Sequence, residues 1–307
     1  MSIFLGLNGF SKENTKVGVV FSPANYPNHS RKDTIQFFED AKKIASHIVV
    51  NVHWKKPLRI AKLYILRKLI RAHGMKFHLY FNPIEFYGMN KKPTLPKNIG
   101  NTFRSKKVRW AYKKMVKKLI NLKPDVFGLA NEANLLALNS REFFPFITLS
   151  QETYRMIKAI RSNQKVTMSF QWDYAQRKKQ FRAITSFHRS LDIYSFTTYP
   201  HRFRNYRKIP ENYYSYIKKI IPYEKPIAFA GVGWSAKKEN QQVVQAKFYY
   251  QLVQKAKKLK VEFMSLALLN DIILFKGKLK KLNTVGLKTK AGKIKESYKV
   301  FLDLKDF

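Results

Sequence analysis

The chain has 307 residues, 45% of them apolar, and 60 Lys and Arg against 19 Asp and Glu give a formal net charge of +41. The length suits one large α/β domain, and the lack of cysteine excludes disulfides, thiolate nucleophiles and cysteine-ligated metals. No apolar run reaches the length of a membrane span, and the first residues lack the basic start and long apolar segment of a signal peptide. We therefore expect a soluble protein, cytoplasmic by default, with residues 1–16 as a short N-terminal extension.

Lysines are spread along the chain and do not form one tail or stripe. They recur on expected helices, for example at Lys113, Lys114, Lys117 and Lys118, and again between residues 276 and 295. This distribution predicts solvated outer faces of helices. The alternative is a polyanionic partner, either an acidic polysaccharide or a nucleic acid.

Eight apolar runs are typical of strands that are buried on both faces of a parallel sheet. In chain order, they span residues 17–21, 47–53, 76–81, 125–132, 165–173, 191–198, 226–231 and 262–269. Helical patterns follow them, from Asp33 to about residue 44, over 58–72, from Ser105 to about residue 119, and over 150–161, 178–187, 210–220, 240–259 and 292–304.

Eight strand–helix units in a chain of this length predict a single closed (β/α)8 barrel over residues 1–307. An open doubly wound sheet usually begins with a glycine-rich phosphate turn, and the chain has neither GxGxxG nor GxxxxGK[ST]. Nothing in the composition divides the chain into two domains.

The organising stretch is DVFGLANEAN, residues 125–134, where a short apolar run ends in Asn131 and Glu132. In a barrel all strand ends meet at one mouth. The side chains expected there are His53, Asn82, Asn131, Glu132, Gln171, Trp172, Asp173, Tyr199, Gly231, Trp234, Asn270 and Asp271. Amides, carboxylates and aromatic rings are the groups that bind sugars. We expect no metal and no cofactor, because His53 is the clearest strand-end histidine and no HExxH spacing exists.

Three of these strand ends carry a family resemblance. Strand four ends in Asn131-Glu132, strand six in Tyr199-Pro200, and strand seven begins the stretch KPIAFAGVGWS, residues 225–235. The pattern resembles the large clan of retaining TIM-barrel glycoside hydrolases that includes galactanases, mannanases and cellulases. The later segment 286–298 is similar to the ending of many members.

The resemblance implies a β-linked poly- or oligosaccharide as substrate or ligand. It implies that Glu132 is the general acid/base and that the Tyr199 hydroxyl orients the nucleophile. The glutamate that serves as nucleophile in the clan is replaced here by Gly231. The residues expected to contact the sugar are Asn131, His53, Asn82, Trp172, Asp173, Trp234 and Asp271.

A retaining glycosidase needs two carboxyl groups, one as acid/base and one as nucleophile, and Gly231 supplies none. Three hypotheses remain. In the first, the protein hydrolyses glycosides with a rearranged pair, in which Asp173 or Asp271 activates water opposite Glu132. In the second, it is a barrel that kept sugar binding and lost catalysis. In the third, it binds nucleic acid or another polyanion through segments such as RFRNYR, residues 202–207.

Overall fold

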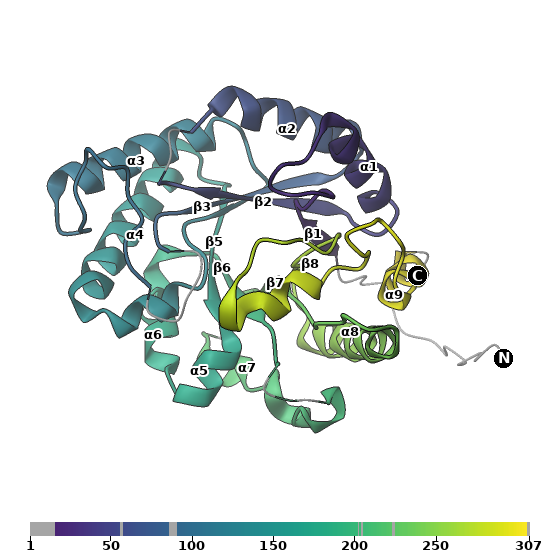
Figure 1. Ribbon diagram of the computed structural model, residues 1–307. Coiled ribbons are helices and arrows are strands. Elements are labelled where there is room, and N and C mark those ends of the chain that lie inside the picture. The colour runs from purple at the N-terminus through teal and green to yellow at the C-terminus, as the bar shows by residue number, and fades with distance from the viewer. Residues whose placement is uncertain are drawn as a thin grey trace.

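The computed structural model describes residues 16–55, 58–85, 91–201, 203, 205–222 and 225–305. Eight parallel strands form a closed barrel in chain order, and β1 also pairs with β8 (Figure 1). The strands are β1 Val17–Val20, β2 His47–His53, β3 Lys76–Asn82, β4 Val126–Gly128, β5 Lys165–Gln171, β6 Ile193–Thr198, β7 Ile227–Val232 and β8 Met264–Leu266. The predicted (β/α)8 fold is confirmed. The expected N-terminal extension, apart from Lys16, lies outside the described residues.

Helices form a ring around the barrel (Figure 1). They are α1 Arg31–Ala41, α2 Ile60–Ala72, α3 Lys106–Ile120, α4 Ser140–Ile160, α5 Trp172–Lys178, α6 Phe181–Thr185, α7 Ile217–Ile220, α8 Glu239–Leu259 and α9 Glu296–Lys305. Short 3-10 turns are η1 Ala133–Leu138, η2 His188–Ser190, η3 Tyr206–Lys208, η4 Glu211–Tyr213 and η5 Gly277–Thr284. The predicted cap of α3 is present, because the Ser105 side chain accepts a hydrogen bond from the amide of Val108.

The structure corrects the prediction for the helix after strand four. The sequence pattern placed its start at Ser150, but α4 begins at Ser140 and contains Pro145. A proline has no N–H, so the carbonyl four residues earlier, that of Arg141, loses its helical donor. The side chain of Arg104 replaces it, donating from Nε to the Arg141 carbonyl at 3.2 Å.

Several other boundaries also differ from the prediction. β4 ends at Gly128 and not at Glu132, β8 covers only Met264–Leu266 of the predicted 262–269, and the helix predicted over 178–187 is the short α6, Phe181–Thr185. Strand β5 ends at Gln171, because the Gln171 side chain accepts from the amide of Tyr174 and caps α5. Trp172 and Asp173 therefore belong to a helix and not to a strand end. The segment 210–220, expected as one helix, forms the turn η4 and the short helix α7.

The barrel interior is filled by large rings that face glycines on the neighbouring strand. A Cβ built at Gly18 would lie 2.1 Å from the ring of His47, and one at Gly128 would lie 2.2 Å from the ring of Tyr80. Each glycine is the register partner of the ring it faces. These glycines leave room for the rings, which fill the barrel between its two ends.

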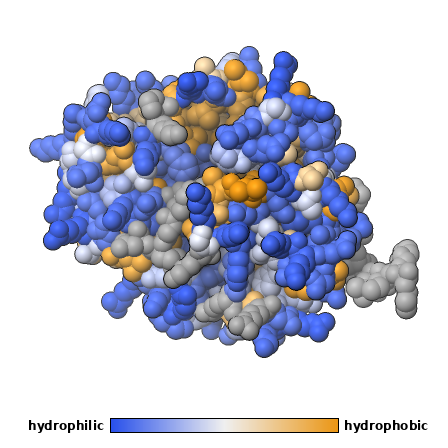
Figure 2. Space-filling view, viewed as in Figure 1, coloured by the Kyte–Doolittle hydropathy of each residue, from blue (hydrophilic) through white to orange (hydrophobic). Residues whose placement is uncertain are grey.

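The molecular surface is mainly hydrophilic on the face shown in Figure 2, with a small hydrophobic area near its centre. The lysines predicted to face solvent do so on α3, where Lys114, Lys117 and Lys118 are exposed. Among the described residues, no helix is both long enough and apolar enough to cross a membrane.

Candidate functional site

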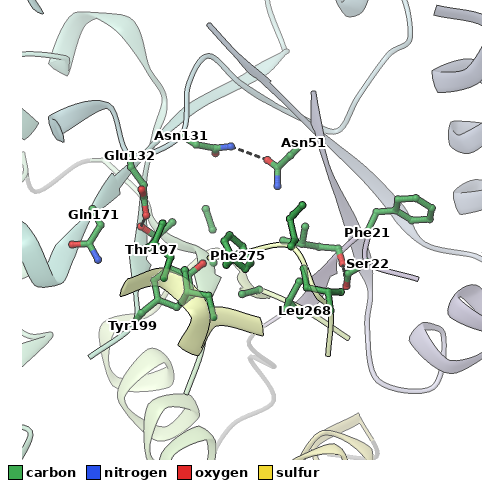
Figure 3. Close-up of a pocket in the computed structure, with 18 of the residues that line it drawn as sticks. Phe21, Ser22, Asn51, Asn131, Glu132, Gln171, Thr197, Tyr199, Leu268 and Phe275 are labelled. Carbon is green, nitrogen blue, oxygen red and sulfur yellow. Dashed lines mark hydrogen bonds between the residues drawn. The ribbon is translucent and has the colours of Figure 1, made fainter. Parts of the chain in front are cut away.

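A cavity of about 320 Å³ lies at the carboxyl ends of the strands. Figure 3 shows Asn131 and Glu132 on one side of it, Phe21, Ser22 and Leu268 on another, and Phe275 between them. Polar groups come mainly from β2 and the ends of β4, β5 and β6, whereas the segments after β1 and β8 contribute much of the apolar wall. The cavity therefore has a polar wall facing an apolar one, as small-molecule sites commonly do.

Glu132 is fixed at the cavity wall by its backbone and by both carboxylate oxygens. Its amide donates to Ser169 Oγ at 2.9 Å. Thr197 Oγ1 donates to Oε1 at 2.9 Å, and Lys91 Nζ lies 3.2 Å from Oε2. The backbone of Glu132 has φ 54° and ψ 44°, a left-handed conformation that L residues rarely adopt. The surrounding contacts therefore hold this carboxylate in a costly conformation.

Asn131 lies beside Glu132 in a network of amides. Its Nδ2 donates to Asn51 Oδ1 at 2.9 Å, a bond drawn in Figure 3. Its backbone amide donates to Asn82 Oδ1 at 3.2 Å, and its own Oδ1 accepts from Ser169 Oγ at 3.3 Å. Asn82 is completely buried and does not line the cavity. Asn131 is thus a cavity residue, whereas Asn82 holds the turn after β4 in place.

Gly231 and Tyr199 lie together at the cavity. The register between β6 and β7 shifts after Phe196, which pairs with Phe229, while Thr197 pairs with Gly231. This irregularity inserts one extra residue in β7, and consequently both Ala230 and Gly231 line the cavity. A Cβ built at Gly231 would lie 3.0 Å from the Tyr199 hydroxyl oxygen. Burial and the nearby Glu132 carboxylate raise the pKa of Tyr199, which keeps its hydroxyl protonated.

Two histidines also line the cavity, and both are neutral at pH 7. Burial and the charge of Lys91 lower the pKa of His53. Burial and the charge of Lys281 lower the pKa of His201 to about 4. The ring of His201 stacks on that of Tyr199, and its Nε2 has no hydrogen-bond partner among the described residues. This nitrogen is buried, so the cavity faces other atoms of the ring.

Asp173 lies behind the cavity wall and holds the end of β6. Its Oδ2 accepts from the amide of Tyr199 at 2.6 Å and from Gln171 Nε2 at 3.1 Å. Its Oδ1 accepts from Tyr213 and Thr198 hydroxyls at 2.7 and 3.0 Å. Burial nevertheless raises the pKa of Asp173. The structure does not bring Asp173 into the cavity lining.

Asp271 is likewise outside the cavity lining. Both of its oxygens lie 2.8 Å from Lys295 Nζ, and Oδ1 also accepts from the amide of Gly286 at 3.0 Å. Lys295 is 1% exposed. This buried ion pair links the segment after β8 to the residue that precedes α9.

The two tryptophans predicted to bind sugar lie in the hydrophobic core. Trp172 is fully buried, and its indole N–H donates to the Tyr213 carbonyl at 3.1 Å. Trp234 is 6% exposed and packs against Phe248 at a ring distance of 4.9 Å. Neither lines the cavity, because Trp172 begins α5 and Trp234 packs its ring on α8.

Sequence reasoning missed several cavity residues. Side chains alternate between the two faces of a strand, and Asn51 in β2 and Thr197 in β6 are on the face that points into the barrel. This alternation would have pointed to both residues. No local signal marks Lys91, which is 0% exposed and reaches Glu132 from the loop after β3. The apolar wall comes from the segment after β8, through Leu274, Phe275, Leu279 and Leu282.

Within the described residues, no three His, Asp or Glu side chains are grouped so that they could hold a metal ion. The cation-rich segment 202–207 is only partly described, since Arg202 and Arg204 lie outside the described residues.

No protein-family model and no curated protein sequence matches the chain. Several solved structures are similar to the chain in fold. The exo-β-1,4-mannosidase Op5Man5 from Opitutaceae bacterium strain TAV5 is similar with a TM-score of 0.75 and 12% identity, over 95% of this chain and 59% of that one. A GH5_18 variant from Bifidobacterium longum subsp. longum, in complex with Manβ1-4GlcNAc, has a TM-score of 0.72 and 13% identity, over 95% of this chain and 78% of that one.

A family 39 glycoside hydrolase from Bacteroides cellulosilyticus WH2 has a TM-score of 0.64 and 14% identity, over 94% of this chain and 63% of that one. This chain therefore spans about three fifths of the length of the mannosidase and of the family 39 enzyme. At these identities the likeness is one of fold: the chain has the eight-stranded barrel on which these glycoside hydrolases are built.

Proposed function

We propose that this protein is a carbohydrate-binding barrel of the glycoside hydrolase type, in which Glu132 keeps the acid/base position and no nucleophile stands opposite it. The observation that carries the proposal is the composition of the cavity wall. Among the described residues that line it, Glu132 is the one carboxylate. Hydrolysis by either common mechanism requires two carboxyl groups.

The two carboxylates that could have replaced the nucleophile are engaged elsewhere. The oxygens of Asp173 accept from four donors, and those of Asp271 are held by Lys295 and the Gly286 amide. Both serve to hold loops in position. A rearranged catalytic pair is therefore not supported, and binding without cleavage is the function that fits the wall best.

The ligand that suits the cavity is a neutral saccharide. Its described lining contains one carboxylate, Glu132, and one cation, Lys281. Asn51, Asn131 and Gln171 offer amide groups for sugar hydroxyls, while Phe275 offers an aromatic face in place of the buried tryptophans. Because a structural neighbour binds Manβ1-4GlcNAc, a β-1,4-linked mannoside is the first ligand to test.

The test compares wild type, Glu132→Gln and Gly231→Glu. Binding of Manβ1-4GlcNAc is measured by calorimetry, and hydrolysis of aryl β-glycosides is followed by NMR to identify the anomer released. We expect wild type to bind and not to cleave, and Glu132→Gln to bind about tenfold more weakly through loss of a charged acceptor. Gly231→Glu should gain slow cleavage with retention, since its carboxylate would stand beside the Tyr199 hydroxyl.

Cleavage by wild type with inversion would contradict the proposal and show that a second carboxylate acts in the site. A wild type that binds no member of a panel of neutral β-linked glycans would also contradict it. A matched control is Gly231→Gln, which puts a side chain of the same size at the same position without the carboxylate and should create no cleavage.

A further inference from the structure

A second cavity, of about 260 Å³, lies at the opposite end of the barrel, where the strands begin. Its floor includes the rings of His47, His78 and Phe263. Six cationic side chains line it: Lys16, Arg71, Lys76, Lys123, Arg161 and Lys165. The filled barrel interior, with Tyr80 against Gly128, separates this cavity from the one that contains Glu132.

The fold concentrates positive charge at this cavity. Lys76 and Lys165 are the first residues of β3 and β5, and they lie on the same side of their strands as the interior residues Tyr80 and Thr167. Both therefore face the barrel axis at its amino end. Two carboxylates share the cavity, Asp125 paired with Arg71 at 2.7 Å and Glu262 paired with Lys165. The other four cations have no carboxylate within ion-pair distance among the described residues.

The floor includes two buried histidine rings. His47 and His78 stack at 4.2 Å, and His47 Nε2 is engaged by Ser265 Oγ at 2.8 Å. His78 is 3% exposed, and its Nδ1 has no hydrogen-bond partner among the described residues. Burial and the neighbouring cations lower the pKa of both histidines, that of His47 to about 3.

We propose that this amino-end cavity binds a small oxyanion, phosphate or sulfate, either free or as the ester group of a larger molecule. Lys16, Lys76, Lys123 and Arg161 supply the opposing charge, and the rings of His47 and His78 lie against the floor. The guanidinium of Arg161 can contact two oxygens at once. This site is independent of the saccharide cavity and stands if the proposed function fails.

The experiment titrates full-length protein with inorganic phosphate or sulfate, replacing chloride at constant ionic strength so that general screening stays the same. Calorimetry gives the affinity, and the ring resonances of His47 and His78 show where the anion binds. The test variant is Lys76→Gln with Arg161→Gln. The matched control, Lys106→Gln with Lys107→Gln, removes the same charge from exposed positions in the first turn of α3. A glucose phosphate is titrated in parallel.

We expect one anion per chain, shifts of the His47 and His78 ring signals, and binding about tenfold weaker in the test variant than in wild type and control. Tighter binding of the sugar phosphate would identify an esterified oxyanion, and tighter binding of inorganic phosphate a free one. The proposal is overturned if binding does not saturate, if both variants weaken it equally, or if the two histidine signals stay unchanged.

Discussion

The conformation of Glu132 is determined by two opposing energies. A left-handed backbone costs a non-glycine residue about 1–2 kcal/mol, so glycine at position 132 would relieve that cost. However, the carboxylate is also the partner of Lys91, whose side chain is completely buried. Removing one member of a buried ion pair typically costs about 3–5 kcal/mol. The ion pair therefore outweighs the backbone strain.

We expect Glu132→Gln, which keeps the backbone strain, to lower the free energy of unfolding by about 3 kcal/mol because the buried Lys91 ammonium loses its contact with the Glu132 carboxylate. Adding Lys91→Met should restore part of this loss, since the second change removes the buried charge. Urea unfolding of both single variants, the double variant and wild type gives the coupling energy. Additive effects of the two changes would show that the pair does not hold the site together.

At the scale of elements, the segment that follows β8 determines how the cavity closes. It carries Leu274, Phe275 and Leu282 to the apolar wall and ends in the turn η5. We expect Phe275→Ala to weaken binding of a β-mannoside about tenfold, because the sugar loses an aromatic face, and Phe275→Tyr to keep it. Calorimetry on the three forms is the measurement. Equal affinities would place the sugar against another wall.

The helix caps should differ in strength. Ser30 forms a capping box with Asp33, in which the Ser30 hydroxyl accepts from the Asp33 amide at 3.1 Å and the Ser30 amide donates to the carboxylate at 2.7 Å. Ser105 has one cap bond to the amide of Val108, at 3.4 Å. Ser30→Ala should therefore cost about 1 kcal/mol of unfolding free energy, and Ser105→Ala less. Urea unfolding of the two variants compares them, and the reverse order would contradict the geometric argument.

At the scale of the whole molecule, buried neutral histidines should make the protein sensitive to acid. The folded-state pKa is lowered to about 3 for His47 and about 4 for His201, and it lies well below 6.5 for His78, with burial as the first cause in each. Between these values and 6.5 the unfolded chain binds protons that the folded chain does not. Stability is therefore present above about pH 6.5 and is lost as the pH falls towards 4.

We expect urea unfolding at pH 7, 6, 5 and 4 to show this loss. His201→Asn should remove the part of this loss that His201 causes, on the order of 2 kcal/mol of unfolding free energy between pH 7 and 4. A variant that loses as much stability on acidification as wild type would show that His201 does not contribute to the pH dependence.

Much of the fold could be predicted from the sequence, because each element is specified locally. Buried parallel strands are continuous apolar runs, and the long helices α2, α3 and α8 carry regular apolar stripes. The start of α4 could not be found in this way, since Pro145 argues against a helix unless Arg104, distant in sequence, bonds the Arg141 carbonyl. The break in segment 210–220 likewise has no local marker.

For the candidate site, local sequence patterns were enough to place Asn131, Glu132, His53, Tyr199 and Gly231 at or just after strand ends that share one mouth, and all five line the cavity. Which side chains enter the cavity depends on the three-dimensional packing. Trp172 and Trp234 point into the core, Asp173 and Asp271 are committed to other partners, and Lys91 arrives from a loop. The physical reason is that strand order follows from local periodicity, whereas the direction and partners of a side chain depend on contacts between residues far apart in the chain.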